Sequence, residues 1–168
     1  MAGRIEVLLM RHGEAEEWAD GGDAQRELTS RGRTMAVRAG AMLRASELLP
    51  TVAVASPFVR AQQTLRGVLE ATGMRLDAIT EPALVPGTPP ERAIEALIAA
   101  APTGGGRLLA VSHNPCVTSV LSQLVGGGSR MCFAVSVGDI AHLSVDPSDR
   151  SAVLLGYVPA RVLDALAR

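Results

Sequence analysis

The stretch Leu8-Leu9-Met10-Arg11-His12-Gly13-Glu14 places an arginine, a histidine and a glycine directly after an apolar run. Residues 5–10 are mostly long or β-branched and show little alternation, which predicts a strand covered on both faces. Arg11 offers a planar fork of donors for phosphate oxygens, and neutral His12 offers a ring nitrogen as nucleophile. Gly13 lets the backbone turn and approach a ligand closely. These residues are candidates for binding and attacking a phosphoryl group, although Arg-His alone fits a surface dipeptide equally well.

The composition is that of a globular chain without a general affinity for polyanions. Its 168 residues are 48% hydrophobic and 20% charged, with a formal net charge of -1. This predicts one domain over residues 1–168 and argues against nucleic-acid binding. All 16 basic side chains are arginine, so the chain has no lysine for a Walker-type phosphate loop or a Schiff base. An aromatic content of 2% leaves few rings to stack nucleic-acid bases.

The cysteines and the first apolar run indicate the compartment. Cys116 and Cys132 form neither a disulfide framework nor a metal-binding Cys-x-x-Cys pair, so a reducing, cytoplasmic setting fits best. The run at residues 5–10 is short and ends at Arg11, which argues against a signal peptide or a membrane span. We therefore expect a cytoplasmic protein that does not bind membranes.

Predicted strands and helices alternate up to residue 125, and two further strands follow. This order predicts a three-layer α/β/α sandwich with a mostly parallel central sheet and a C-terminal antiparallel hairpin. Residues 14–27 lack any period and are rich in turn residues, so they predict a surface loop, which we call the lip, over Arg11 and His12. The expected strands cover residues 5–10, 51–55, 77–80, 108–111, 141–145 and 152–158. The first expected helix begins at Thr29 or Ser30 and ends near residue 46, and the second begins at Ser56-Pro57 and ends near residue 73. The third begins at Pro90 and ends near residue 101, and the fourth begins at Cys116 and ends near residue 125.

Residues that can carry chemistry follow three of the predicted parallel strands. Arg11-His12 follows the first, Ser56-Pro57 with Arg60 follows the second, and Ser112-His113-Asn114 follows the fourth. Ligands of open α/β sheets bind outside the carboxyl ends of the strands, so these residues are expected at one rim. Taken alone, Arg60 fits a solvated helix residue and His113 a core or capping histidine. Two arginines and two histidines at one rim are a more specific signal for phosphate.

Four segments together resemble the histidine phosphatase superfamily, and the short chain is similar to its SixA-type phosphohistidine phosphatases. They are Met10-Arg11-His12-Gly13-Glu14-Ala15, Arg26-Glu27-Leu28-Thr29, Ser56-Pro57-Phe58-Val59-Arg60-Ala61-Gln62-Gln63-Thr64 and Val111-Ser112-His113-Asn114-Pro115. The resemblance runs from about residue 5 to the final hairpin. It implies a phosphoglycerate mutase-like fold and a phosphatase that uses neither a metal ion nor another cofactor.

The resemblance also implies roles for the residues. His12 would attack phosphorus in line and give an Nε2-phosphohistidine enzyme, which water then hydrolyses. Arg11, Arg60 and a protonated or hydrogen-bonding His113 would neutralise the equatorial oxygens in the transition state.

Three further residues are expected at the substrate, and a phosphate or sulfate ion is expected to fit the site. Arg26 stands where SixA-type proteins place a further basic residue, so it is expected to add a cation from the lip, with a solvent-facing arginine as the alternative. Gly13 and Asn114 are the other expected substrate contacts.

One departure bears on the substrate. Larger members of the superfamily usually carry a glutamate as general acid two residues after a leucine that follows the third strand, whereas Leu84-Val85-Pro86 has a proline there. General acid catalysis is typically worth ~10²–10⁴-fold, so esters with poor alkoxide leaving groups should react slowly. Phosphohistidine loses an imidazole that water can protonate, so it needs an acid less. Glu14 or Glu81 could act as the acid instead. The alternative is that both are ordinary solvated carboxylates.

Three hypotheses follow from these residues. The first is a phosphohistidine phosphatase acting on a phosphorylated protein, such as a phosphotransfer domain of a signalling relay. The second is a phosphatase of small phosphate esters, which would need a carboxylate such as Glu81 as acid. The third is a binder of phosphate or phosphohistidine without catalysis, and the presence of His12 with both arginines counts against it.

Overall fold

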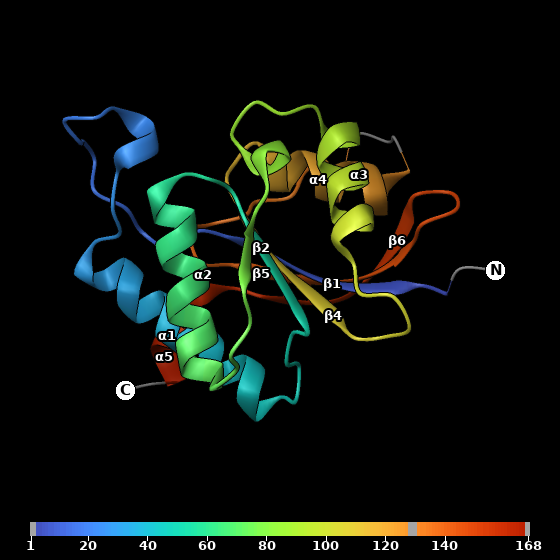
Figure 1. Ribbon diagram of the computed structural model, residues 1–168, viewed down its shortest axis with the longest axis horizontal. Helices are drawn as coiled ribbons and strands as arrows, with labels where there is room; N and C mark the ends of the chain where they lie inside the picture. Colours follow the sequence, from blue (N-terminus) through green and yellow to red (C-terminus); the bar gives the residue numbers. More distant parts are fainter. Residues whose placement is uncertain (1–2, 128–130, 167–168) are drawn as a thin grey trace.

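The computed structural model describes residues 3–127 and 131–166, in which a six-stranded sheet lies between two layers of helices (Figure 1). The strand order is β3-β2-β4-β1-β5-β6. Strands β1 to β4 run parallel, β5 runs antiparallel to β1, and β6 runs antiparallel to β5. The predicted parallel sheet with a late antiparallel hairpin is confirmed. The strands are β1 (Ile5–Arg11), β2 (Val52–Ala55), β3 (Ala78–Thr80), β4 (Arg107–Ser112), β5 (Ile140–Asp146) and β6 (Ser151–Val158).

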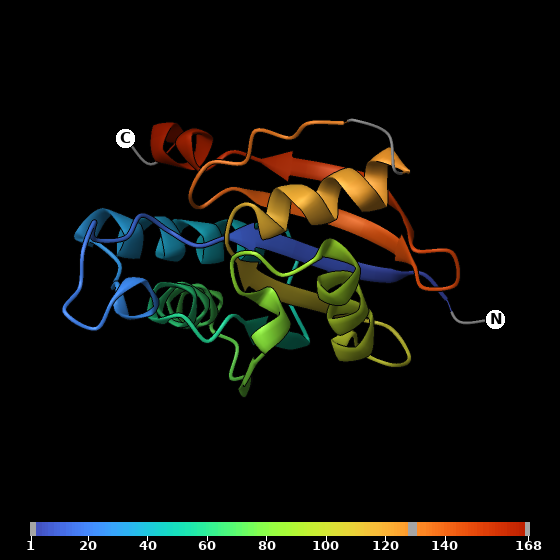
Figure 2. The ribbon, with the colours of Figure 1, turned by 90° about the horizontal axis from the view of Figure 1, so that it is seen from above.

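Helices cover both faces of the sheet, as the alternation of elements predicts. One layer holds α1 (Ser30–Ala45), α2 (Val59–Thr72) and α5 (Ala160–Leu166). The other holds α3 (Pro90–Ala100) and α4 (Cys116–Gly126), which Figure 2 shows across the sheet from α1. Two short 3₁₀ helices, η1 (Asp23–Gln25) and η2 (Pro82–Leu84), lie in the connections. Within the described residues, no helix is long and apolar enough to cross a membrane.

Strand β1 is the centre of both hydrophobic cores. Val7 and Leu9 pack on the side of α3 and α4, whereas Leu8 and Met10 pack on the side of α1 and α2. All four side chains are at most 1% exposed, which explains why the sequence here does not alternate. Burial of a large apolar side chain contributes about 1.5–3 kcal/mol, so β1 is a firmly held strand with Arg11 at its end.

Helices α1 and α2 pack closely against each other. Thr29 is the N-cap of α1, because its side-chain oxygen accepts a hydrogen bond from the Gly32 N–H at 3.0 Å. Where α1 passes α2, Gly40 has no room for a side chain: a Cβ would lie 2.7 Å from the Ala71 Cβ and would also clash with the Val68 carbonyl. This close approach fixes α2 and the arginine in its first turn relative to β1.

Two sequence expectations for helices need correction. The second helix begins at Val59 and not at Ser56-Pro57, because the buried Ser56 hydroxyl accepts a hydrogen bond from the Phe58 N–H at 3.3 Å and shapes a turn before the helix. Helix α5 has no counterpart among the predicted elements. Its 7 residues make about two turns, which is too short for an apolar period to be recognised.

Candidate active site

The carboxyl ends of β1, β2 and β4 meet at one edge of the sheet and bring the predicted residues together. The sheet hydrogen bonds continue past the strands, since the His12 N–H donates to the Ser112 carbonyl and the Ser56 N–H to the Val111 carbonyl, both at 3.0 Å. A cavity of about 380 Å³ lies at this edge. Its wall includes six of the seven predicted residues, namely Arg11, His12, Arg26, Arg60, His113 and Asn114.

His12 is buried and presents a free electron pair on Nε2. Its Nδ1–H donates to the Gly13 carbonyl at 2.7 Å, which leaves Nε2 as the acceptor. The Arg60 Nε–H donates to that Nε2 at 3.1 Å. Burial, followed by the charges of Arg60 and Arg11, lowers the pKa of His12 to about 4 against the opposing hydrogen bond to Gly13. His12 is therefore neutral at pH 7, the state that a nucleophile needs.

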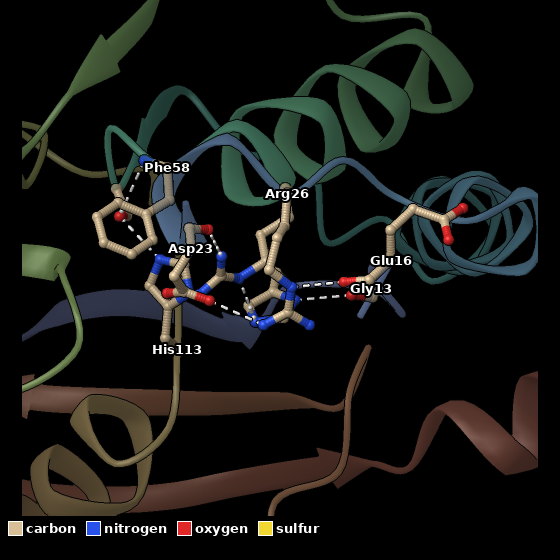
Figure 3. A network of polar contacts seen from close by, with 9 residues as sticks. Gly13, Glu16, Asp23, Arg26, Phe58 and His113 are labelled. Atoms are coloured by element: carbon tan, nitrogen blue, oxygen red, sulfur yellow. Dashed lines mark hydrogen bonds and ion pairs between the residues drawn. The ribbon is translucent and has the colours of Figure 1, made fainter. Parts of the chain in front are cut away.

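Arg60 is held in one orientation by its neighbours in the site. Its side chain is only 5% exposed, and the Phe58 ring lies 5.0 Å from the guanidinium carbon. Nη2 donates to the Asp23 carboxylate at 2.9 Å, and Nη1 donates to the Asp23 carbonyl. The guanidinium thus extends from His12 on one side to Asp23 of the lip on the other. Figure 3 shows Asp23, Phe58 and His113 in this network.

Asp23 belongs to the site, and sequence reasoning missed it. Its two carboxylate oxygens bind different arginines, with Oδ2 near Arg60 and Oδ1 accepting from Arg26 Nη1 at 2.8 Å. These hydrogen bonds lower the pKa of Asp23. The only signal in the sequence is the i,i+3 spacing of Asp23 and Arg26, which pairs opposite charges across one helical turn. In a lip with no period, that spacing is too weak to identify a site.

Arg26 lies on the cavity wall. Besides Asp23 it binds the Glu16 carbonyl through Nε, and its side chain is 28% exposed. The bonds from Arg60 to Asp23 hold the lip against the start of α2. The bonds from Arg26 to Asp23 and Glu16 stabilise the lip itself, and Figure 3 shows these three residues.

His113 faces His12 from the end of β4. The ring centroids are 4.8 Å apart, and His113 Nε2 shares a 2.8 Å hydrogen bond with the Ser56 hydroxyl. Burial first, then the nearby His12 and Arg60, lowers the pKa of His113 to about 3, which favours the hydrogen-bonding form over the protonated one. Its Nδ1 is buried and finds no partner among the described residues.

Arg11 and Asn114 share one backbone acceptor. Arg11 Nη1 donates to the Val135 carbonyl at 2.8 Å, and Asn114 Nδ2 donates to the same oxygen at 2.9 Å. Arg11 Nε and Asn114 Oδ1 are buried without a partner in the part of the chain described. An unpaired buried polar atom is costly. The three unpaired atoms belong to residues that line one cavity, so they are candidate hydrogen-bonding groups for a ligand.

The buried carboxylate of Asp139 stabilises the segment that carries the Val135 carbonyl. Asp139 is 3% exposed and accepts from the Ser136 N–H and the Ala160 N–H, both at 2.8 Å, and from the Tyr157 hydroxyl at 2.6 Å. The Asp139 carbonyl also accepts from the Arg11 N–H at 3.1 Å. Asp139 therefore fixes residues 135–139 against the end of β1, and sequence reasoning did not find it.

Gly13 is the one predicted site residue that does not line the cavity, and the structure gives it a packing role. It is absent from the cavity wall, and its N–H donates to the Thr64 hydroxyl at 3.0 Å. A Cβ at this position would lie 2.7 Å from the Gly32 carbonyl oxygen. Gly13 is thus required by the close approach of the chain to α1 and by its carbonyl bond to His12.

Neither of the carboxylates considered as a general acid is free. Glu14 borders the cavity, but its oxygens accept from the Thr29 hydroxyl and from Arg31 Nη1, both at 2.9 Å. Glu81 accepts from the Ala83 N–H at 2.8 Å and does not reach the cavity wall. Pro86 does line the cavity, at the place where a proton donor would otherwise be expected.

Known proteins match both the sequence and the fold. The family model of the histidine phosphatase superfamily (branch 1) matches residues 7–85. A phosphohistidine phosphatase SixA homolog from Haemophilus influenzae is 30% identical over 160 residues, which cover 90% of this chain and 94% of the relative. The structure of the protein histidine phosphatase SixA complexed with tungstate is 27% identical, with a TM-score of 0.83 over 95% of this chain and 99% of that one.

A more distant structure shows the fold alone. Phosphoglycerate mutase from Bacillus anthracis is 14% identical and superposes with a TM-score of 0.71, covering 99% of this chain and 98% of that chain. The expected phosphoglycerate mutase-like fold is confirmed. The chain belongs to the histidine phosphatase superfamily, as a SixA-type member. It is accordingly a hydrolase, a phosphatase that does not require a metal ion.

Proposed function

We propose that this protein removes phosphate from a phosphorylated histidine of another protein, through a covalent phosphohistidine on His12. The observation that carries the proposal is the state of His12. The ring is neutral, its Nδ1–H is bound to the Gly13 carbonyl, and its Nε2 lone pair lies beside Arg60 in a cavity lined by cations. A fixed, neutral imidazole next to anion-binding groups is an activated nucleophile for phosphorus.

In the first step, His12 Nε2 attacks phosphorus as the P–N bond to the substrate breaks. Arg60 releases Nε2 and turns its donors to the equatorial oxygens, where Arg11 adds a second cation. The His12 ring becomes positive when it accepts the phosphoryl group, and the Gly13 carbonyl at Nδ1–H stabilises that charge. In the second step, water attacks phosphorus, the bond to His12 breaks, and phosphate leaves.

The leaving group favours P–N over P–O substrates. An alkoxide needs a proton as it departs, but Pro86 cannot supply one and the Glu14 carboxylate is bound by Thr29 and Arg31. An imidazole can leave without an acid at the departing nitrogen. The bound tungstate of the SixA structure, an oxyanion with the tetrahedral shape of phosphate, supports phosphate or sulfate as a ligand of the equivalent place here.

The two alternatives have less support. A phosphatase of small esters with poor leaving groups would need a free carboxylate at Pro86 or Glu81, and neither provides one. A binder without catalysis would not need the hydrogen bond that leaves His12 Nε2 unprotonated.

The test measures turnover of two substrate classes. The protein is incubated with a chemically phosphorylated histidine protein and with simple alkyl phosphate esters, and we expect turnover of the P–N compound. The His12→Ala variant should lose at least about 10³-fold in kcat, the range for loss of a nucleophile. His142→Ala is the matched control, because His142 lies on β5 and bonds to Glu6.

The possible outcomes separate the three hypotheses. Rapid hydrolysis of esters alone would favour the second. Phosphate binding without turnover of either class would favour the third. Full activity of His12→Ala would contradict the covalent mechanism.

A further inference from the structure

Asp23 is a hydrogen-bond acceptor in a site where the arginines supply hydrogen-bond donors. Asp23 is 54% exposed through its side chain, at the mouth of the site. Each of its oxygens accepts one hydrogen bond from an arginine, and a carboxylate oxygen has two lone pairs. Both oxygens can therefore accept one more donor. Because Arg60 and Arg26 hold the pKa of Asp23 below its usual value, the group is an acceptor at neutral pH and not an acid.

The geometry of Arg60 places this acceptor relative to the nucleophile. Arg60 Nε donates to His12 at 3.1 Å and Nη2 donates to Asp23 at 2.9 Å, and these two nitrogens form one edge of the guanidinium fork. An edge of this kind can bind two oxygens of a phosphoryl group side by side. A phosphoryl group on that edge therefore has His12 at one end and Asp23 at the other.

Cleavage of the P–N bond is favoured when the distal nitrogen of the departing ring is protonated. Phosphohistidine carries phosphorus on one ring nitrogen, and its other nitrogen is either bare or protonated. If that distal nitrogen is bare, the ring must depart as an imidazolate, which is a poor leaving group. If it is protonated, the ring departs as neutral imidazole and no proton has to reach the departing nitrogen.

The nucleophile His12 already has a hydrogen-bond acceptor at its own distal nitrogen. His12 has its distal Nδ1–H bound to the Gly13 carbonyl at 2.7 Å, which stabilises positive charge on the ring. When a phosphoryl group moves from one imidazole to another, the attacking and the departing rings are nearly equivalent. We therefore expect the departing ring to have an acceptor at its own distal nitrogen. Two carboxylate residues border the described cavity. Glu14 bonds to Thr29 and Arg31, whereas Asp23 shares the Arg60 guanidinium with His12, so Asp23 is the carboxylate placed relative to the nucleophile.

We propose that the Asp23 carboxylate accepts a hydrogen bond from the distal ring N–H of the substrate's phosphohistidine and so selects its protonated form. This inference rests on the proposed function. As the P–N bond breaks, its electron pair stays on the departing nitrogen, the bond from phosphorus to His12 Nε2 forms, and the distal proton stays in place. Asp23 is thereby a specificity-determining residue for P–N over P–O substrates, and the site needs no general acid.

The test compares Asp23→Asn with wild type on two substrates. One is a chemically phosphorylated histidine protein, and the other is p-nitrophenyl phosphate, whose leaving group needs no proton. Loss of a hydrogen bond to a charged group predicts a fall of roughly 10- to 100-fold in the single-turnover rate of phosphoenzyme formation from the P–N substrate. The ester rate should fall by a smaller factor, because for that substrate Asp23 serves only to hold Arg60 and Arg26 in place.

The pH dependence gives a second readout. The carboxylate favours the protonated ring in the enzyme complex, so the alkaline limb of that single-turnover rate should move to lower pH in Asp23→Asn. Asp20→Asn is the matched control, since Asp20 is an exposed carboxylate of the lip with no ion pair in the described structure. It should behave as wild type in both measurements.

The outcomes separate this inference from the proposed function. Equal losses on both substrates would show that Asp23 only orients the two arginines, and an unchanged P–N rate would show no role, so either result overturns the inference alone. A wild type that hydrolyses the ester but not the P–N substrate overturns the proposed function and the inference together. Inhibition by inorganic phosphate checks that the variant's anion site is intact.

Discussion

At the scale of single residues, the site combines two neutral histidines with closely placed cations. His12 and His113 are 7% and 1% exposed, and burial disfavours the charged form of both. Arg60 and Arg26 would repel each other in the same small space, and the Asp23 carboxylate between them offsets that repulsion. The site is thus arranged before a substrate arrives, which is the condition for electrostatic stabilisation of a transition state.

The buried histidines predict how stability depends on pH. In the folded state their pKa values are about 4 for His12 and about 3 for His113, below the ordinary 6.5 of the unfolded chain. From pH 6.5 down to about 4 the unfolded state binds more protons, so stability falls as the pH falls through this window. In His12→Asn one of the two groups is gone, and the midpoint of thermal unfolding should fall less steeply between pH 6.5 and pH 4.5 than in wild type. Equal slopes would contradict the buried, neutral state of His12.

The sequence could predict some of these residues and not others, for a physical reason. Arg11, His12, Arg60 and His113 follow the ends of parallel strands, and those ends meet at one edge in any sheet of this kind. Asp23 lies in a loop without a period, so only the folded chain brings it to Arg60. The Val135 carbonyl that holds Arg11 has no signal at all, because every residue has a carbonyl.

At the scale of elements, the sequence predicted the ends of most strands and helices to within one or two residues. Apolar periods and turn residues set those ends locally. The errors arise where a local signal is ambiguous or short. Ser56-Pro57 looked like a helix start, whereas the Ser56 hydroxyl binds His113. Helix α5 is stable through contact with α1, which the local sequence does not encode.

The contact between α1 and α2 gives a prediction about stability. In Gly40→Ala the added methyl would lie 2.7 Å from the Ala71 Cβ, so the two helices must move apart. Overpacking of this kind typically costs about 1–3 kcal/mol, measurable as a lower urea midpoint. Val37→Ala on the same helix is the control: Val37 is 52% exposed, and its change should stay within about 0.5 kcal/mol. Equal effects of the two substitutions would contradict the close packing.

At the scale of the whole molecule, Asp139 connects distant parts of the chain to the site. Its carboxylate binds Tyr157 at the end of β6 and Ala160 at the start of α5, and its backbone lies against Arg11. Burial, and then Asp139 itself, raises the pKa of Tyr157, so the hydroxyl stays a donor. The C-terminal hairpin and α5 thereby support Arg11, an arginine of the candidate site at the other end of the sequence.

This connection predicts graded losses of stability. Tyr157→Phe removes one donor from the carboxylate and should lower the free energy of unfolding by about 1–2 kcal/mol. Asp139→Ala leaves three donors without their acceptor and should cost about 3 kcal/mol or more. Urea denaturation measures both. Because residues 135–139 also hold Arg11, Asp139→Ala should lower kcat as well. A loss in Tyr157→Phe as large as that in Asp139→Ala would show that the carboxylate is not the centre of the network.

Strand β1 lies between a parallel neighbour, β4, and an antiparallel one, β5. The chain therefore enters β5 at the same edge where it leaves β1, and the segment before β5 joins the loops after β1, β2 and β4. In an entirely parallel sheet that segment would lie at the opposite edge. This segment can therefore vary independently: new side chains before β5 can alter which surfaces approach His12 while the parallel strands, and His12 itself after the end of β1, stay unchanged.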